Sequence, residues 1–332
     1  MHPPKINSLE VPIINGTPQF VLLRGKTHDT PVLLVVHGGP GAPLFPFVHD
    51  IGVGSGLEQL FTVAYWEQRG TGKTLKHSLD ASRMTLEQMV SDTLEVTEWL
   101  CHRLSVERIY LMGHSWGTIL GTLAAHERPE RFYHYVGVGQ VGSVARGEAA
   151  SYRWATEETN RRNHRAAARD LARIGAPPHD HRGMMAERKW VTRFGGFVKG
   201  KSYPEPNMLF KLLKTRYYSL TDLVLMTRHP FLALRSLVFE KNAVDLFTQA
   251  PELAIPVTFI MGRHDWVTPY EVARAYFERL KAPQKRFISL DSSAHMPFSE
   301  DPVAFGAAVR SVLVGVTGET EPHTTGSPPP SK

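Results

Sequence analysis

The chain has 332 residues, of which 42% are hydrophobic and 21% charged, close to the averages for globular proteins. This length allows one large core, or one core with a smaller covering unit, and the composition excludes disorder of the chain as a whole. No apolar run approaches the roughly 20 residues of a membrane-spanning helix, and residues 1–10 lack the apolar stretch of a secretory signal. We therefore expect no membrane partner.

The charge balance raises the question of nucleic-acid binding, because 38 lysines and arginines against 32 aspartates and glutamates give a net charge of +6. The densest basic stretch, 161–193, is interrupted by Asp170, Asp180 and Glu187, and its aromatic residues are not interleaved as base-stacking platforms would be. We interpret it as a solvated helical face and expect no nucleic-acid partner. Cys101 is the only cysteine, which excludes an internal disulfide, and we expect a cytoplasmic protein.

Short apolar runs alternate with helical patterns along most of the chain. Residues 11–24 predict a β-hairpin that turns at Asn15-Gly16. Residues 32–36 form a continuous β-branched and leucine run, which is typical of a strand buried on both faces. Further strands are predicted at 61–66, 108–112, 135–138, 257–261 and 286–290. This alternation predicts an α/β fold, a mostly parallel sheet with helices on both faces.

Three helix starts are marked by local signals. Thr85 and Gln88 match a capping box before an apolar stripe of helical period. Thr268 and Glu271 match a second box, with Pro269 at the first helical position. A third helix is expected to start at Asp301-Pro302.

The strand–helix alternation stops over the middle of the chain. Residues 143–250 are rich in arginine, alanine and histidine and show helical period, so we expect a helical insertion there. The core then consists of 1–142 and 251–314, and the polar, proline-rich segment 315–332 is predicted to be a disordered tail.

The strongest chemical signal is the motif Gly113-His114-Ser115-Trp116-Gly117, which follows a predicted strand and opens a helix. In this context G-x-S-x-G is a nucleophile elbow, a tight turn that holds a serine hydroxyl clear of the sheet. The glycines are needed because the backbone passes close to the neighbouring strand and helix. We therefore predict that Ser115 is a catalytic nucleophile.

A glycine-rich loop, His37-Gly38-Gly39-Pro40-Gly41, follows the strand at 32–36. Ligands bind at this edge of open α/β sheets, and glycines let the backbone approach them. We predict that the amides of Gly39 and Trp116 form an oxyanion hole and that Gly38 contacts the substrate. The segment 65–70, which ends another strand, is expected to brace this loop by hydrogen bonds.

The base and the residue that orients it are expected in the order serine, acid, histidine. Asp265 follows the strand at 257–261, and His295 follows the strand at 286–290. His264 has the wrong chain order for the base, and Asp291 is too close to His295 in sequence to orient it. We therefore predict a catalytic triad of Ser115, His295 and Asp265.

Together these segments resemble the proline iminopeptidase family of α/β-hydrolases. The resemblance rests on the motifs at 37–41, 66–72 and 113–117, and on the segments 262–265 and 293–295. It implies an eight-stranded, mostly parallel sheet with a helical cap inserted after the sixth strand. It also implies hydrolysis of an N-terminal residue, preferably proline, from short peptides or amides, with no cofactor and no metal.

The chain departs from that family at several positions. Glu67 stands where the family usually has Asp, and Thr74 stands where it has Ser. Family members bind the substrate's free amine through cap glutamates, for which Glu205 and Glu240 are the candidates here. The alternative is an esterase, amidase or lactonase for a small metabolite, for example in a biosynthetic pathway. A further alternative is a receptor that keeps the pocket without catalysis. We expect a monomer or a small homo-oligomer.

Overall fold

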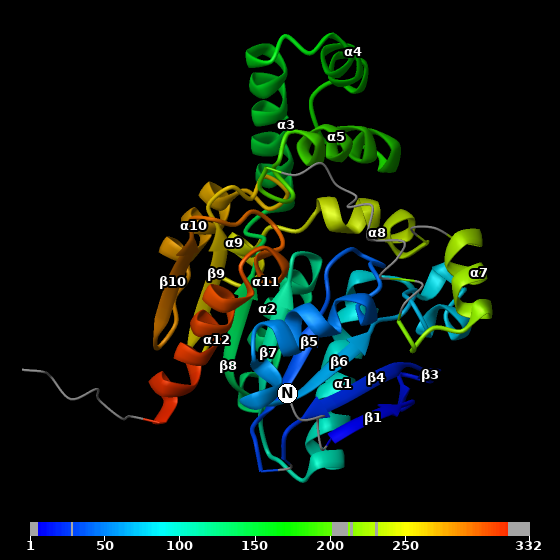
Figure 1. The fold of residues 1–332 in the computed structure, drawn as a ribbon, viewed down its shortest axis with the longest axis vertical. Coiled ribbons are helices and arrows are strands. Elements are labelled where there is room, and N and C mark those ends of the chain that lie inside the picture. The colour runs from blue at the N-terminus through cyan, green and yellow to red at the C-terminus, as the bar shows by residue number, and fades with distance from the viewer. Residues whose placement is uncertain (1–5, 28, 201–211, 213–214, 230–231, 318–332) are drawn as a thin grey trace, which may run out of the picture.

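A computed structural model describes residues 6–27, 29–200, 212, 215–229 and 232–317. Its centre is an eight-stranded sheet in the order β1-β4-β6-β5-β7-β8-β9-β10 (Figure 1). The strands are β1 (Ile6–Glu10), β4 (Phe20–Gly25), β5 (Val32–Val36), β6 (Thr62–Glu67), β7 (Ile109–His114), β8 (Phe132–Val138), β9 (Val257–Gly262) and β10 (Lys285–Leu290). Neighbours from β6 to β10 are parallel, whereas β4 is antiparallel to both β1 and β6. The predicted fold class is confirmed.

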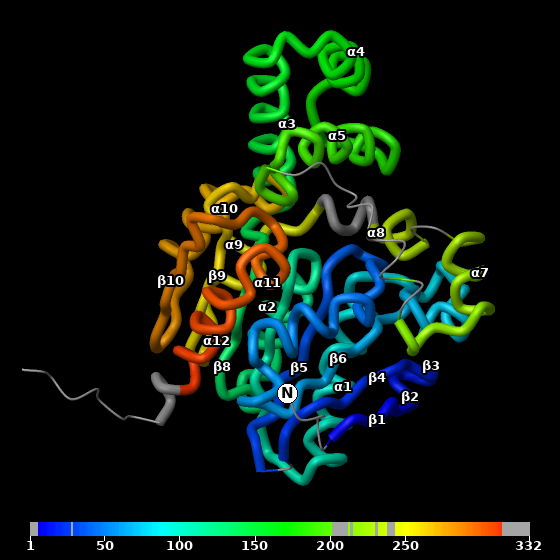
Figure 2. Tube along the Cα trace, viewed as in Figure 1, coloured from blue at the N-terminus to red at the C-terminus, as the bar shows by residue number. Residues whose placement is uncertain are grey.

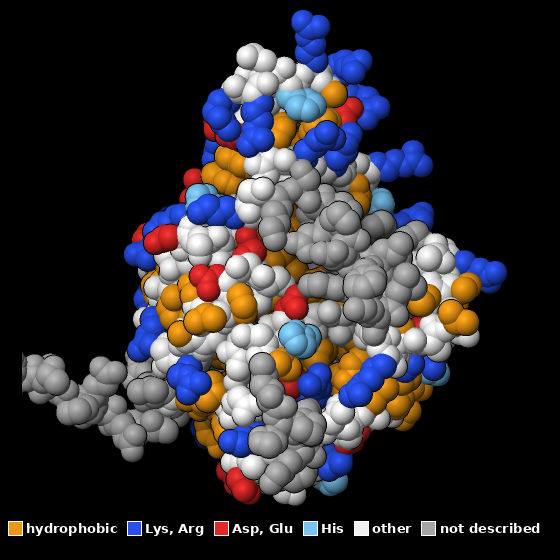
Figure 3. Space-filling model, viewed as in Figure 1, with side chains coloured by type: hydrophobic (Ala, Val, Ile, Leu, Met, Phe, Trp, Pro, Cys, Tyr) orange, Lys and Arg blue, Asp and Glu red, His pale blue; other side chains and the backbone are white. Residues whose placement is uncertain are grey.

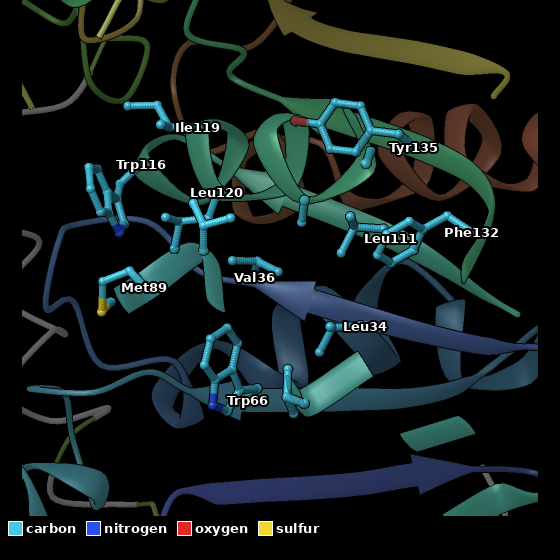
Figure 4. Close-up of a cluster of buried hydrophobic side chains, with 14 of the residues drawn as sticks. Leu34, Val36, Trp66, Met89, Leu111, Trp116, Ile119, Leu120, Phe132 and Tyr135 are labelled. Carbon is cyan, nitrogen blue, oxygen red and sulfur yellow. The ribbon is translucent and has the colours of Figure 1, made fainter. Parts of the chain in front are cut away.

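Both faces of the sheet are covered. On one face α1 (Leu86–Leu104) and α2 (Trp116–Glu127) pack over the even-numbered side chains of β5, such as Leu34 and Val36 (Figure 4). On the other face the odd-numbered side chains Leu33 and Val35 join a cluster completed by α12 (Pro302–Thr317) and the short π-helical segment His49–Gly54. Burial on both sides explains why the β5 sequence has no polar positions.

The N-terminal hairpin is smaller than predicted. Asn15 and Gly16 form the turn, with φ of +45° and +73°, but its arms are only β2 (Ile13–Ile14) and β3 (Thr17–Pro18). The rest of the run, β4, pairs with β1 and β6 instead. The reason is that residues 20–23 are all buried, and an isolated hairpin cannot bury both faces of its strands.

Two of the three predicted helix starts are confirmed. The Thr85 side chain accepts a hydrogen bond from the Gln88 amide at the start of α1, and Asp301 accepts one from the Ala304 amide at the start of α12. The capping box at Thr268 is wrong. Helix α10 (Tyr270–Arg279) begins after Pro269 without a side-chain cap, and the Thr268 hydroxyl donates to Asp265 at 2.8 Å. This bond to a carboxylate is charge-assisted, and it holds the Thr268 hydroxyl at Asp265 rather than at the first amides of α10.

The insertion between β8, the sixth strand of the sheet in chain order, and β9 is helical (Figure 2). Its helices are α3 (Val144–Arg161), α4 (Arg165–Ile174), α5 (His181–Arg193), α7 (Leu220–Arg228), α8 (Leu232–Asn242) and α9 (Leu246–Gln249). We refer to the region from α3 to α8 as the cap.

Basic side chains spread over several sides of α3 to α5 (Figure 3). Several of them pair with cap carboxylates, as Arg161 and Arg162 do with Glu158 and Lys189 does with Asp170. This arrangement fits the solvated face expected from the sequence.

The C-terminal helix is longer than expected. Helix α12 continues through Thr317, into the segment 315–332 that was predicted to be a tail, and 318–332 lie outside the described residues. The apolar residues 312–316 extend the helix because α12 already packs on the sheet. Among the helices described, none is long and apolar enough to span a bilayer.

Candidate active site

The turn between β7 and α2 holds Ser115 in a backbone conformation that residues other than glycine rarely adopt. Its φ is +54° and its ψ −121°, and such a conformation costs about 1–3 kcal/mol unless the surroundings impose it. The surroundings are tight on both sides. A Cβ added to Gly113 would lie 2.4 Å from the Gly117 carbonyl oxygen, and one added to Gly117 would lie 2.0 Å from the Val36 carbonyl oxygen. The glycines of the motif are therefore explained by the close approach of β5, β7 and α2.

Because Gly117 has no room for a side chain, a substitution there should lower the free energy of unfolding. Gly117→Ala is expected to lower the free energy of unfolding by about 3 kcal/mol or more, because the added methyl group meets rigid backbone. Gly147→Ala is the matched control. Gly147 lies inside helix α3, and among the described residues its added Cβ would meet only Pro269, at 3.7 Å, so this variant should gain about 0.5–1 kcal/mol. Urea unfolding of the two variants measures both changes, and equal stabilities would contradict the argument.

Asp265 and His295 are in direct contact below the cap. The Nδ1 atom of His295 lies 2.8 Å from Oδ2 of Asp265, and the two residues are 3% and 1% exposed. A carboxylate only accepts hydrogen bonds, so Nδ1 carries a proton, and in the neutral ring Nε2 is the nitrogen left to act as a base. The carboxylate is itself held by the amides of Val267 and Thr268 on Oδ1 and by the Thr268 hydroxyl on Oδ2. The acid therefore has a fixed orientation.

Ser115 and His295 face one cavity of about 780 Å³ and are linked through their neighbours. The Nε2–H of His114, the residue before Ser115, donates to the His295 carbonyl oxygen at 2.9 Å, and the rings of the two histidines are 4.9 Å apart. Burial lowers the pKa of His114 to about 3, so it stays neutral. The neighbouring rival Asp291 lies elsewhere, because its side chain is 80% exposed and pairs with Arg263 at 3.2 Å.

The glycine loop lies against the nucleophile. A Cβ on Gly38 would be 3.1 Å from the Cβ of Ser115, which accounts for a glycine at this position. Gly39 has a φ of +128°, and with Gly38 and Trp116 it lines the cavity. Trp116 opens helix α2, whose first amide groups have no partner within the helix.

The end of β6 braces this loop, as the sequence predicted. The Gln68 side chain donates to the His37 carbonyl oxygen at 2.9 Å and accepts from the Trp116 indole at 3.2 Å. The Gln68 amide donates to Nε2 of His37 at 3.1 Å. Burial lowers the pKa of His37 to about 4, so its ring stays neutral and its Nδ1–H donates to the Gly38 carbonyl oxygen.

Glu67 lies in the segment that was expected to brace the loop, but its contact with the cap was not expected from the sequence. It accepts hydrogen bonds from the amides of Leu44 and Lys73 and from the Tyr218 hydroxyl in the cap. The Phe45 amide also points to it, at 3.4 Å. Burial raises the pKa of Glu67 to about 7. Glu67 therefore joins the segment after the glycine loop to the cap.

We expect Glu67→Gln to destabilise the protein in a pH-dependent way. The carboxamide NH₂ group accepts no hydrogen bond, so a buried amide that meets one of the two carboxyl oxygens loses its partner, which costs about 1–3 kcal/mol. Wild-type Glu67 has a raised pKa, so its stabilising contribution is present below the unfolded value of 4.5 and is lost as the pH rises through 7. The stability difference between the two proteins should narrow between pH 5 and pH 7, by on the order of 1 kcal/mol per pH unit, and should level off above pH 7. Urea unfolding across this range measures it, and a constant difference would contradict the role of Glu67.

The cap rests on the loops that carry the acid and the base. The His295 amide donates to the Phe197 carbonyl oxygen at 3.0 Å, and the Trp266 amide donates to that of Gly196. Glu300, another residue that the sequence did not mark, accepts from the Lys199, Ala294 and Met296 amides.

One acidic cap side chain lines the described part of the cavity wall. Glu148 lies in the first turns of α3 and is 3% exposed. Nothing in the sequence marks Glu148, because a glutamate in a polar helix is typical of a solvated face. Of the two glutamates expected from the sequence, Glu205 and the side chain of Glu240 both lie outside the described residues.

Known proteins resemble this chain over most of its length. A family model described as the alpha/beta hydrolase fold matches residues 31–302. A probable aminopeptidase, YbaC of Bacillus subtilis (strain 168), is 32% identical over 299 residues, covering 88% of this chain and 92% of that protein. A proline iminopeptidase of Heyndrickxia coagulans is 25% identical over 310 residues, covering 91% and 97%.

Solved structures agree on the fold. The proline iminopeptidase of Mycobacterium smegmatis superposes with a TM-score of 0.67 at 20% identity, covering 93% of this chain and 98% of the other. The resemblance to proline iminopeptidases that the motifs indicated is therefore confirmed. The chain belongs to the α/β-hydrolase fold family and is a hydrolase.

Proposed function

We propose that the protein is a serine aminopeptidase that releases an N-terminal residue from short peptides or amides. Glu148, a buried carboxylate in the wall of the cavity that also holds Ser115, is the observation that supports this proposal most directly. An N-terminal α-amine is a cation at neutral pH, and a buried carboxylate is the protein group that pairs with it best. In this proposal Glu148 takes the part for which Glu205 and Glu240 were the sequence candidates.

The proposed mechanism begins with proton transfer from Ser115 Oγ to Nε2 of His295 as the oxygen attacks the carbonyl carbon. Asp265 holds the imidazole tautomer and stabilises the imidazolium. The amides of Gly39 and Trp116 receive the oxyanion, each donor contributing roughly 2.7–4 kcal/mol in the transition state. His295 then gives its proton to the leaving amine, and a water molecule repeats the steps to free the acid.

The test compares an aminoacyl arylamide that has a free amine with its N-acetylated counterpart. Wild type should prefer the free amine, and Glu148→Gln should lower kcat/KM for it by about 10- to 100-fold, since a hydrogen bond to a charged group is worth about 1.5–3 kcal/mol. Glu157→Gln, an exposed carboxylate on the same helix, is the matched control and should change little. The aminopeptidase would be rejected if wild type had the same kcat/KM for the free-amine and N-acetylated substrates. It would also be rejected if Glu148→Gln and Glu157→Gln changed kcat/KM equally.

The second candidate is an esterase, amidase or lactonase for a small metabolite. It is favoured by the size of the cavity and by a wall that is mainly apolar away from the cap. In the same assay this enzyme would hydrolyse acyl esters at least as well as aminoacyl arylamides. We further propose a cytoplasmic protein that acts on small molecules or short peptides as a monomer or small homo-oligomer, without a nucleic-acid partner.

A further inference from the structure

The cavity that contains Ser115 has two chemically different halves. The charged side chains in the described part of its wall, Glu148, Arg188 and Lys189, all come from cap helices α3 and α5. The half on the α12 side of the sheet is lined by six apolar residues that we call the apolar arm: Val35, Ile51, Met112, Val138, Phe298 and Phe305. Each is at most 4% exposed.

The sheet register places the mouth of the apolar arm beside the nucleophile. Val138 is the strand partner of His114, and its carbonyl oxygen accepts the Ser115 amide at 2.9 Å. Val35 and Met112 are partners on the adjoining strands. A group bound in the apolar arm therefore lies next to the carbon that Ser115 attacks.

Aromatic contacts continue the arm away from the site. The ring of Phe298 lies 5.0 Å from that of His114 and 5.9 Å from that of Phe305. Phe47 closes the outer side, with its ring 6.3 Å from Phe298. The histidines at the mouth, His114 and His37, are kept neutral by burial. Nothing charged among the described residues of the arm would pair with a polar ligand.

We propose that the apolar arm is an acyl-side subsite that takes an unbranched or aromatic apolar group of the substrate. This inference rests on the proposed function in that it takes Ser115 as the nucleophile, and it names the substrate class: an apolar acyl group or N-terminal side chain larger than a proline ring. The polar end of such a substrate lies towards the cap. Apolar pockets with a few convergent polar groups are typical of small-molecule sites.

The test uses p-nitrophenyl alkylphosphonates whose alkyl group is methyl, butyl, hexyl or octyl. Ser115 Oγ attacks phosphorus and p-nitrophenolate leaves, so the inactivation rate reports the fit of the alkyl group and needs no amine. In wild type the second-order rate should rise about fourfold per added methylene until the arm is full, the factor that corresponds to about 0.8 kcal/mol.

Variants that change the volume of the arm complete the test. Ile51→Phe should abolish the gain from butyl to octyl and leave the methyl rate within about threefold. Phe298→Leu should extend the gain to longer chains, a result that misfolding cannot produce. Val144→Phe is the control, because Val144 lies in the cap-side half of the same cavity and should scale all four rates alike.

The outcomes separate this inference from the proposed function. Rates that are equal for all chain lengths, or an Ile51→Phe variant that slows all four probes equally, would overturn the apolar arm and leave Ser115 as nucleophile. A wild-type protein that reacts with none of the probes at Ser115 would overturn both.

Discussion

Ser115→Ala is expected to lower kcat for the best aminoacyl arylamide or acyl ester by roughly 10⁴- to 10⁶-fold, the range seen when the nucleophile of a serine hydrolase is removed. The physical reason is that the oxygen that forms the acyl-enzyme is lost, while the cavity and the predicted oxyanion donors remain. The Ser115 side chain makes no hydrogen bond to the first amide groups of helix α2, at whose N-terminus it lies. Its removal should therefore change the free energy of unfolding little.

Ser143→Ala is the matched control for this prediction. Ser143 is 3% exposed and lines the same cavity. Its side chain makes no hydrogen bond to the first amide groups of α3. Its variant should keep activity within about tenfold of wild type. Steady-state rates at equal concentrations of folded protein measure both. Ser115→Ala protein that keeps more than about a hundredth of the wild-type rate would remove Ser115 from the reaction.

The second large effect concerns the carboxylate. Asp265→Asn should lower kcat by about 10⁴-fold, as the same change does in other serine hydrolases. An asparagine can turn its NH₂ group towards Nδ1 of His295, which then becomes the acceptor. The proton moves to Nε2, and the ring loses the free base that faces the cavity. The binding of a substrate analogue should remain, because Asp265 is covered by its own loop.

Asp291→Asn provides the comparison for Asp265→Asn. Asp291 lies just before the base in sequence, but its carboxylate is exposed and pairs with Arg263. Loss of that surface pair should cost less than about 1 kcal/mol of stability and leave kcat unchanged. If Asp291→Asn were the more damaging variant, the assignment of Asp265 as the orienting acid would be wrong.

Signals confined to a few residues predicted the structure well. The strand at 32–36 and the helix after Thr85 lie where the sequence placed them. The nucleophile turn was recognisable because a side chain at either of its glycines would clash with backbone in the motif or in the neighbouring strand. Chain order and the ends of predicted strands also brought out Asp265 and His295, which the structure places in contact.

The capping box at Thr268 failed although the group that bonds to this residue is near in sequence. The Thr268 hydroxyl donates to Asp265, three residues earlier, and α10 starts without a side-chain cap. A capping pattern describes a hydroxyl that accepts from the first amides of its own helix. It could not show that the neighbouring carboxylate is buried and bonded to His295, which depends on the packing of a loop 30 residues further along the chain.

By itself the sequence determined the α/β-hydrolase fold, the helical insertion after the sixth strand and the three residues predicted to carry the chemistry. Only the tertiary structure decided the partners of Glu67 and the surroundings of Glu148. The bond between Glu67 and Tyr218 joins residues 151 positions apart, and the apolar arm draws its walls from segments between Val35 and Phe305. Strand and turn patterns arise from backbone sterics over a few residues, whereas a cavity and a buried carboxylate depend on which distant segments pack together.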